Sequence, residues 1–170
     1  MEGGVSIRDA KKDDFNTILD IINRNIRDET SDYRWDEIDL DTLAEWFDDR
    51  KLQGFPVIVA VVNDVVVGYA SYCQFRERIG FQYSVEHSIY VQPGYTGKGI
   101  GGKLMDVLLK AAKDGGMRCM IACINADNED SIKFHVEKYS FTHRGILKEV
   151  GRKFDTWLDM VLLQKMLCDV

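Results

Sequence analysis

The sequence predicts a mixed α/β fold in a single domain spanning residues 1–170, with a mostly antiparallel central sheet and helices on both of its faces. In the front half, two runs of β-branched residues flank Asn63 and Asp64, which tolerate the tight turn of a β-hairpin. In the back half, strand, helix and strand alternate between residues 82 and 124, as in a crossover connection. An antiparallel half joined to a crossover half indicates a mixed sheet covered by helices.

The individual elements follow from hydrophobic periodicity and from capping residues. Residues 5–10 alternate as a strand, and the helix after them can be capped by Asp13 or Asp14. The inward face of that helix is predicted to comprise Phe15, Ile18, Leu19, Ile22 and Ile26. A second helix is predicted near residues 41–50, with three inward side chains, Leu43, Trp46 and Phe47. The remaining elements are predicted as strands at 82–91, 117–124, 141–147 and 154–163, and as helices at 100–113 and from Asn128 onward.

Composition and charge narrow the function. The net charge of −6 opposes binding to a long polyanion, so no nucleic-acid partner is expected. The four cysteines form no CxxC pair and the three histidines have no metal-ligand spacing, so no metal is expected. Cys119 and Cys123 are interpreted as small buried hydrophobes. The N-terminus has no apolar signal core and no apolar run approaches ~20 residues, which predicts a cytoplasmic protein without a membrane partner.

Residues 94–102 form a glycine-rich segment that leads directly into a helix, and five of these nine residues are glycine. Bare backbone N–H groups ahead of a helix suit a phosphate group, because the helix dipole favours anions there. A P-loop is disfavoured: with Gly97 and Lys98 as its GK pair, Gln92 replaces its first glycine and Gly99 its Ser or Thr. A turn without a ligand is also disfavoured, since each glycine costs roughly 0.5–1 kcal/mol relative to alanine.

Two further interpretations of the glycine segment are a Rossmann dinucleotide site and a loop for the diphosphate of an acyl-CoA. Residues 97–102 match G-x-G-x-x-G letter for letter. A Rossmann loop, however, directly follows the first strand of its βαβ unit, whereas residues 92–96 separate strand and glycines in this chain. The acyl-CoA loop needs only a backbone cradle, to which Lys98 and Lys103 add positive charge. The sequence therefore favours the acyl-CoA loop.

The segment "HSIYVQPGYTGKGIGGKLM" resembles the acetyl-CoA motif of the GNAT superfamily of N-acetyltransferases. Three further segments, "GYASYCQFRERIGFQYSVEHSIYV", "INADNEDSIKFH" and "LKEVGRKFDTWLDMVLLQ", resemble the phosphinothricin and methionine sulfoximine/sulfone acetyltransferase family. The resemblance covers nearly the whole chain, with the motifs in the right order. It implies a GNAT fold, acetyl-CoA as co-substrate, and acetylation of the free amine of a small amino acid or analogue. It also implies a homodimer with pockets near the interface.

Two residues are candidates for the base that the reaction needs, because an amine must lose a proton to become nucleophilic. Glu86 is a carboxylate in a strand of mostly apolar or small residues, so it is either structurally paired or functional. The resemblance implies that it contacts the substrate amine and acts as a general base. His135 shares a helix face with Asn128 and Ser131 by spacing. The resemblance implies that His135 is a second base, and a structural histidine is the alternative.

The resemblance implies that acetyl-CoA is bound by a strand, the glycine loop and a short helix. Backbone N–H groups of the strand would pair with the pantetheine arm, and one of them would donate to the oxyanion. An asparagine of the short helix would contact the same arm while capping that helix. The predicted cofactor-binding residues are Ile89, Tyr90, Val91, Thr96, Gly97, Lys98, Gly99, Ile100, Gly101, Gly102, Asn128 and Ser131.

The resemblance also implies a substrate with a free α-carboxylate, which the planar fork of an arginine binds well. Arg76 and Arg78 match the arginine-containing loop of the family and are the predicted carboxylate ligands, with a solvated charged loop as the alternative. Tyr33 and Trp35, in the polar loop 27–40, are predicted to wall the substrate pocket.

Two positions depart from the family pattern. Thr96 stands where the superfamily loop usually has Arg or Gln, which predicts weaker affinity for CoA. The segment "HVEKYSF" (residues 135–141) is one residue longer than the family's H-E-K-x-G-F and has Ser140 in place of glycine. Because an extra residue turns a helix by about 100°, Tyr139 or the helix end is expected to shift near the pocket.

Two other functions stay open on the sequence alone. One is acetylation of a different amine, such as a polyamine or a protein N-terminus. The other is an acyl-CoA sensor that keeps the loop without turnover. Arg76 and Arg78 speak against a polycationic substrate, since like charges repel.

Overall fold

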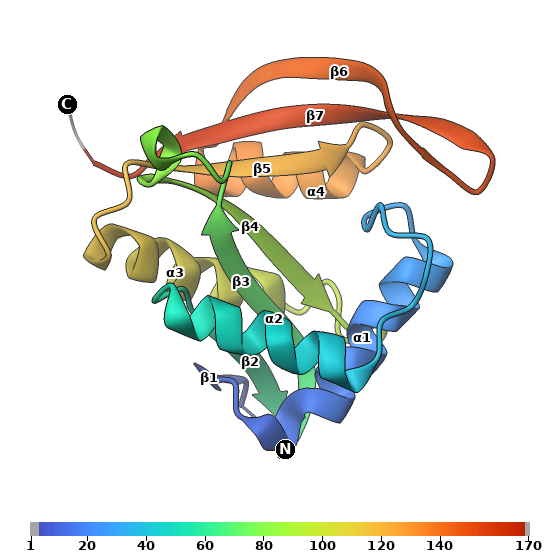
Figure 1. The fold of residues 1–170 in the computed structure, drawn as a ribbon, viewed down its shortest axis with the longest axis vertical. Helices are drawn as coiled ribbons and strands as arrows, with labels where there is room; N and C mark the ends of the chain where they lie inside the picture. Colours follow the sequence, from blue (N-terminus) through green and yellow to red (C-terminus); the bar gives the residue numbers. More distant parts are fainter. Residues whose placement is uncertain (1–3, 169–170) are drawn as a thin grey trace.

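The computed structural model describes residues 4–168 as one seven-stranded sheet in the order β1-β2-β3-β4-β5-β7-β6, with helices on both faces (Figure 1). The strands are β1 Ser6–Asp9, β2 Val57–Val62, β3 Val65–Gln74, β4 Ser84–Val91, β5 Cys119–Asn125, β6 Thr142–Lys153 and β7 Thr156–Met166. The helices are α1 Phe15–Asp28, α2 Leu40–Leu52, α3 Ile100–Asp114 and α4 Glu129–Lys133. Only the β4–β5 pair is parallel among the described strand pairs. The predicted mixed, mostly antiparallel sheet is confirmed.

Two hydrophobic clusters cover the two faces of the sheet. Helices α1 and α2 pack on one face and share one cluster, while α3 packs on the other. The predicted inward face of α1 is largely confirmed, but Leu19 is only partly buried and Ile21 is buried instead. Asp14 is the N-cap residue of α1, yet its carboxylate accepts from both Arg8 Nη atoms, at 2.7 and 2.8 Å. None of the described helices is long and apolar enough to cross a bilayer.

The turns of the two hairpins differ in how well the sequence predicted them. Asn63 and Asp64 both have positive φ, 48° and 63°, as the tight turn between β2 and β3 requires. The last hairpin differs from its prediction, because β6 continues to Lys153 through an irregularity between Leu147 and Gly151. Its turn lies at residues 154–155, both with positive φ, where a strand was expected to start. Asp155 tolerates that conformation, but phenylalanine is rare in it, so the pair did not read as a turn.

One feature of the sheet creates the site. Strand β4 pairs with β5 only from Ser84 to Glu86, which lies opposite Ile121. Beyond that point β4 continues beside β3 as far as Val91, while β5 continues beside β7 as far as Asn125. The two strands therefore diverge, and the edge of β4 after Glu86 has no partner among the described strands.

Candidate active site

A cavity of about 530 Å³ opens where β4 and β5 diverge. Its walls come from β4, β5 and α4, from α1 and α2, and from the loop that joins α1 to α2. Of the predicted site residues, it brings together Tyr33, Glu86, Ile89, Tyr90, Val91, Asn128, Ser131 and His135. The glycine loop, Trp35 and both predicted carboxylate-binding arginines lie outside its lining.

Glu86 lies on the cavity wall at the last paired position of β4. Burial raises the pKa of its carboxyl group, while the neighbouring Cys123 thiol and the Arg76 charge lower it in part. A carboxylate with a raised pKa suits a general base, because its proton affinity approaches that needed near neutral pH. Burial and Glu86 together raise the pKa of Cys123 to about 12, so this cysteine stays a thiol. Cys123 lines the cavity and is only half-buried, unlike the predicted small core residue, whereas Cys119 is buried as predicted.

His135 is buried, with 5% of its surface exposed, and both of its ring nitrogens have partners within the protein. Its Nδ1 lies 2.6 Å from the Ser131 carbonyl oxygen, and its Nε2 lies 2.9 Å from Nε2 of His87. Burial lowers the pKa of both histidines, that of His87 to about 3 with a further contribution from His135. A base needs a free nitrogen, so the geometry favours Glu86 over His135. His87 was not singled out from the sequence.

The glycine loop places its bare residues for two different reasons. Gly97 and Gly99 have φ of 74° and 78°, and no neighbouring atom lies within 4 Å of where a Cβ would be. They therefore allow a left-handed backbone that faces open space at the start of α3. Gly102 instead allows close packing, because its Cβ would lie 2.6 Å from Lys138 Nζ and 3.1 Å from the Tyr139 hydroxyl.

The other predicted loop residues are placed as follows. Thr96 and Lys98 are exposed, and the Lys98 ammonium lies 5.3 Å from the centre of the Tyr95 ring. Ile100 is buried in the core, so only its backbone can face a ligand. Gly101 has the Phe134 ring 3.9 Å from its Cβ position. These positions leave the backbone N–H groups at the start of α3 as the main donors for an anion.

The extra residue in "HVEKYSF" is absorbed by a turn of π-helix, Phe134–Lys138, that continues α4. A π-turn contains one more residue than an α-turn and so accommodates an insertion. The helix ends at Tyr139, and the next residue, Ser140, has a φ of 57°, a conformation that glycine adopts more readily. Tyr139 is buried and its hydroxyl hydrogen-bonds to the Gly102 carbonyl at 2.8 Å and to Asp106 at 3.0 Å. Tyr139 is thus fixed against α3, and the predicted shift of the helix end relative to the family stays a prediction.

The two aromatic residues predicted to wall the pocket take different positions. Tyr33 lines the cavity, and its ring packs on Gly151, where a Cβ would lie 2.6 Å from Tyr33 Cδ1. Trp35, the second of them, is 64% exposed and lies outside the cavity lining. Its indole N–H donates to the Arg152 carbonyl at 3.0 Å, and this acceptor on the β6–β7 hairpin holds the ring away from the pocket.

The predicted arginines are both exposed, and neither lines the cavity. Arg76 lies 4.4 Å from the centre of the Phe75 ring, and its charge still reaches Glu86, whose pKa it lowers. Arg78 has no comparable effect on Glu86. The arginines of the cavity are Arg34 and Arg50, which bind Asp32 and Asp49. Arg34 lies in a polar loop and Arg50 near a helix end. Charged residues are common at both kinds of position, so the sequence alone did not indicate a role in the cavity.

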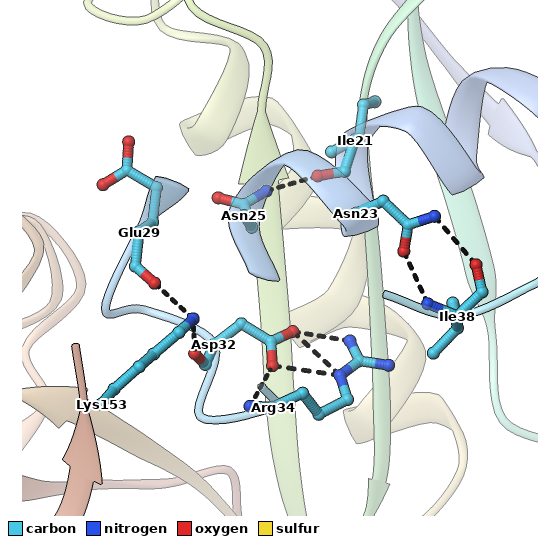
Figure 2. Close-up of polar contacts among 8 residues, drawn as sticks. All are labelled: Ile21, Asn23, Asn25, Glu29, Asp32, Arg34, Ile38 and Lys153. Atoms are coloured by element: carbon cyan, nitrogen blue, oxygen red, sulfur yellow. Dashed lines mark hydrogen bonds and ion pairs between the residues drawn. The ribbon is translucent and has the colours of Figure 1, made fainter. Parts of the chain in front are cut away.

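A buried lysine positions the loop that carries Tyr33 and Arg34 (Figure 2). Lys153, at the end of β6, is 2% exposed, and its Nζ donates to the carbonyls of Glu29 at 2.6 Å and Asp32 at 2.5 Å. The Asp32 carboxylate accepts from Arg34 Nε at 3.0 Å and from Arg34 Nη2 at 2.6 Å. A buried ammonium must be bonded in this way, because an unpaired charge in the interior is strongly unfavourable. The sequence had assigned no role to Lys153.

Taken together, the site has a cavity between diverging strands, a carboxylate with a raised pKa on its wall, and a helix N-terminus suited to anions. The Acetyltransferase (GNAT) family model matches residues 18–141. The L-amino acid N-acyltransferase MnaT of Escherichia coli strain K12 is 38% identical over 160 residues, covering 94% of this chain and 92% of that protein. The L-methionine sulfoximine/L-methionine sulfone acetyltransferase of Salmonella typhimurium strain LT2 is 38% identical over 160 residues, covering 94% and 93%.

The solved structures agree with the sequence comparison. A GNAT superfamily phosphinothricin acetyltransferase from Sinorhizobium meliloti, in complex with acetyl-CoA, superposes with a TM-score of 0.92 at 31% identity, covering 95% of this chain and 88% of that one. The chain belongs to the GNAT acetyltransferase family. The family and the fold predicted from the motifs are confirmed.

Acid is expected to destabilise the protein through its buried histidines. The pKa of His87 is about 3 in the folded protein, against an ordinary value of 6.5, so between these values the unfolded chain binds more protons. The free energy of unfolding should therefore be highest above about pH 6.5 and fall as the pH drops towards 3, by at most about 1.4 kcal/mol per pH unit for this residue. Urea unfolding from neutral pH to about pH 4.5 measures this slope.

The matched variants for this measurement are His87→Gln and His143→Gln, because His143 is exposed on β6. The slope should become shallower in the first variant and stay unchanged in the second. Equal slopes for the wild type and His87→Gln would contradict the expectation.

Proposed function

We propose that this acetyltransferase moves the acetyl group of acetyl-CoA to the free amine of a small amino acid or analogue, of the methionine sulfoximine or phosphinothricin type. The observation that carries the proposal is the position of Glu86, a buried carboxylate at the point where β4 leaves β5. The names of the similar proteins, which include an L-amino acid N-acyltransferase, support the substrate class.

The residues present fit acetyl-CoA. The unpaired edge of β4 at Ile89–Val91 offers backbone groups to an amide-containing arm, as an added strand would need. Gly97 and Gly99 leave open space at the start of α3 for a diphosphate. Asn128 and Ser131 face the same cavity from α4. When bound, acetyl-CoA supplies an activated acyl group as a thioester.

In this proposal Glu86 takes the proton of the substrate ammonium, directly or through water. Its raised pKa makes the carboxylate a better proton acceptor than an exposed one, and its place on the cavity wall lets an amine approach. A backbone N–H of β4 near residues 89–91 donates to the charge that develops on the reacting carbonyl oxygen. The thiol of Cys123, with its pKa near 12, stays neutral and does not compete as a nucleophile.

The test is release of CoA thiol from acetyl-CoA with three separate amine pools: amino-acid analogues (phosphinothricin, methionine sulfoximine, methionine sulfone), polyamines, and peptides. Release with the first pool alone is expected.

Glu86→Gln should lower kcat by about 10²- to 10⁴-fold, because a general base contributes that much, with acetyl-CoA affinity nearly unchanged. The matched control is Glu77→Gln, since Glu77 is exposed in the nearby loop.

The other outcomes identify the alternatives. Release only with polyamines or peptides would assign a different amine. Tight binding of acetyl-CoA without release from any pool would indicate a sensor. Full activity of Glu86→Gln would remove Glu86 as the base.

We propose that Arg76, rather than Arg78, binds the substrate carboxylate. Arg34 and Arg50 already have aspartate partners, whereas Arg76 forms no ion pair among the described residues and lies within electrostatic reach of Glu86. A guanidinium that acts on the charge of Glu86 suits a substrate whose amine and carboxylate share one carbon.

Arg76→Gln should therefore raise the KM for the amino acid by about tenfold or more with a smaller effect on the KM for acetyl-CoA, since a charged hydrogen bond is lost. Arg78→Gln is the matched control and should change neither constant much. Equal effects of the two substitutions would contradict the assignment. Steady-state kinetics with each substrate varied in turn measures both.

We further propose that the protein is a cytoplasmic homodimer that pairs through residues 146–150 of β6. This strand is the edge of the sheet and exposes three apolar side chains, Ile146, Leu147 and Val150, at 42–50% of their surface. Long apolar edges are usually covered in the native assembly.

Light scattering after size exclusion should give the mass of two chains. Val150→Lys should give one, whereas Leu52→Lys, at an 88% exposed site on α2, should not. A monomeric wild type would overturn this.

A further inference from the structure

The buried pair His87 and His135 is not needed by a mechanism in which Glu86 is the base. We propose that His87 is a positioning residue: its single hydrogen bond to His135 fixes the spacing between β4 and α4, the two walls of the acetyl-CoA slot. This inference rests on the proposed function, because it assigns the slot to acetyl-CoA. It concerns the shape of the slot and leaves the chemistry to Glu86.

The hydrogen bonds determine where the protons are. The Ser131 carbonyl oxygen, 2.6 Å from His135 Nδ1, can only accept, so His135 carries its proton on Nδ1. In a neutral ring the other nitrogen is then an acceptor, and His87 must donate from its own Nε2 across the 2.9 Å contact. The remaining nitrogen, His87 Nδ1, is buried without a partner among the described residues. His87 Nδ1 is therefore unprotonated, and the single proton between the two rings is the one on His87 Nε2.

The histidine pair lies at the end of the slot where β4 and β5 begin to separate. His87 is the first residue of β4 beyond Glu86, where pairing with β5 stops. His135 lies in the π-turn that follows α4. From His135 the chain of bonds continues to the Ser131 carbonyl, and the Ser131 N–H donates to the Asn128 side chain at 3.2 Å. The hydrogen bond between the rings thus links the β4 wall to the helix start that carries the predicted cofactor contacts.

The surroundings keep this link rigid and neutral. The rings of Phe134 and Phe141 lie 5.2 and 5.1 Å from the His135 ring, and the Phe141 ring lies 5.9 Å from that of His87. No carboxylate is hydrogen-bonded to either imidazole among the described residues. A proton on His135 Nε2 would bring two N–H groups together at 2.9 Å, so the link holds only while that nitrogen stays an unprotonated acceptor.

The first experiment reads the protons directly in the wild-type protein. A two-bond proton–nitrogen correlation spectrum of protein labelled with nitrogen-15 histidine distinguishes the two neutral tautomers from the cation. At neutral pH, His135 should be protonated on Nδ1 only and His87 on Nε2 only. The spectra of His87→Gln and His143→Gln assign the signals, since the chain has three histidines. A proton on Nε2 of His135 would overturn the proposal.

The second experiment separates positioning from general stability. Binding of acetyl-CoA is measured by calorimetry, and KM and kcat are measured with the amine that the pool assay identifies. His87→Leu removes the donor and should weaken acetyl-CoA binding by about tenfold with little change in kcat, as expected for one lost buried hydrogen bond. His87→Gln can still donate from the same place and should restore most of the affinity. His143→Gln is the exposed control and should match the wild type.

The results also separate this inference from the proposed function. A wild type that binds no acetyl-CoA would overturn both. A wild type that binds acetyl-CoA, with His87→Leu binding equally well, would overturn the positioning role alone. A fall in kcat without a change in affinity would also overturn it, because His87 would then act in the chemistry. If His87→Leu fails to fold, the tautomer measurement and the His87→Gln affinity still decide.

Discussion

The divergence of β4 from β5 is the constraint on which the rest of the site depends. Backbone N–H and C=O groups in a sheet normally pair on both sides, so a strand that loses its neighbour leaves a row of donors and acceptors open. In this chain the opening starts immediately after Glu86, and the cavity follows from it. The placement of the carboxylate at the cavity and the open strand edge therefore both follow from one change in pairing.

The side of the cavity formed by the loop between α1 and α2 is built differently, through long-range anchoring of that loop. The segment between α1 and α2 has no regular structure from Thr30 to Asp39, yet both of its ends are fixed. Lys153 binds its first residues, and Asn23 exchanges two 2.9 Å hydrogen bonds with Ile38 near its far end (Figure 2). Such a loop can vary its side chains while the anchors keep its path.

Much of the fold could be predicted from the sequence because its signals are local. Asn63–Asp64 and Asn128 occupy a turn and a helix cap that depend on neighbouring residues only. The site was harder, because its geometry depends on contacts distant in sequence. Lys153 and its acceptor in Glu29 are 124 residues apart, and the His87–His135 contact spans 48 residues. The glycine loop and Glu86 could be singled out from the residues themselves, and the resemblance added their roles. Trp35, predicted to wall the pocket, instead binds a carbonyl on a hairpin distant in sequence.

The π-turn at Phe134–Lys138 has a consequence for comparing this chain with its relatives. An insertion in an α-helix normally rotates every later side chain about the axis. In this chain one turn is a wider π-turn, and His135 contacts His87 of β4 while Tyr139 contacts Gly102 of α3. Proteins of different length in this segment can thus present equivalent surfaces to the same ligand. An alignment gap at this point can therefore mark the presence of a π-turn. It is a poor guide to a change in substrate specificity.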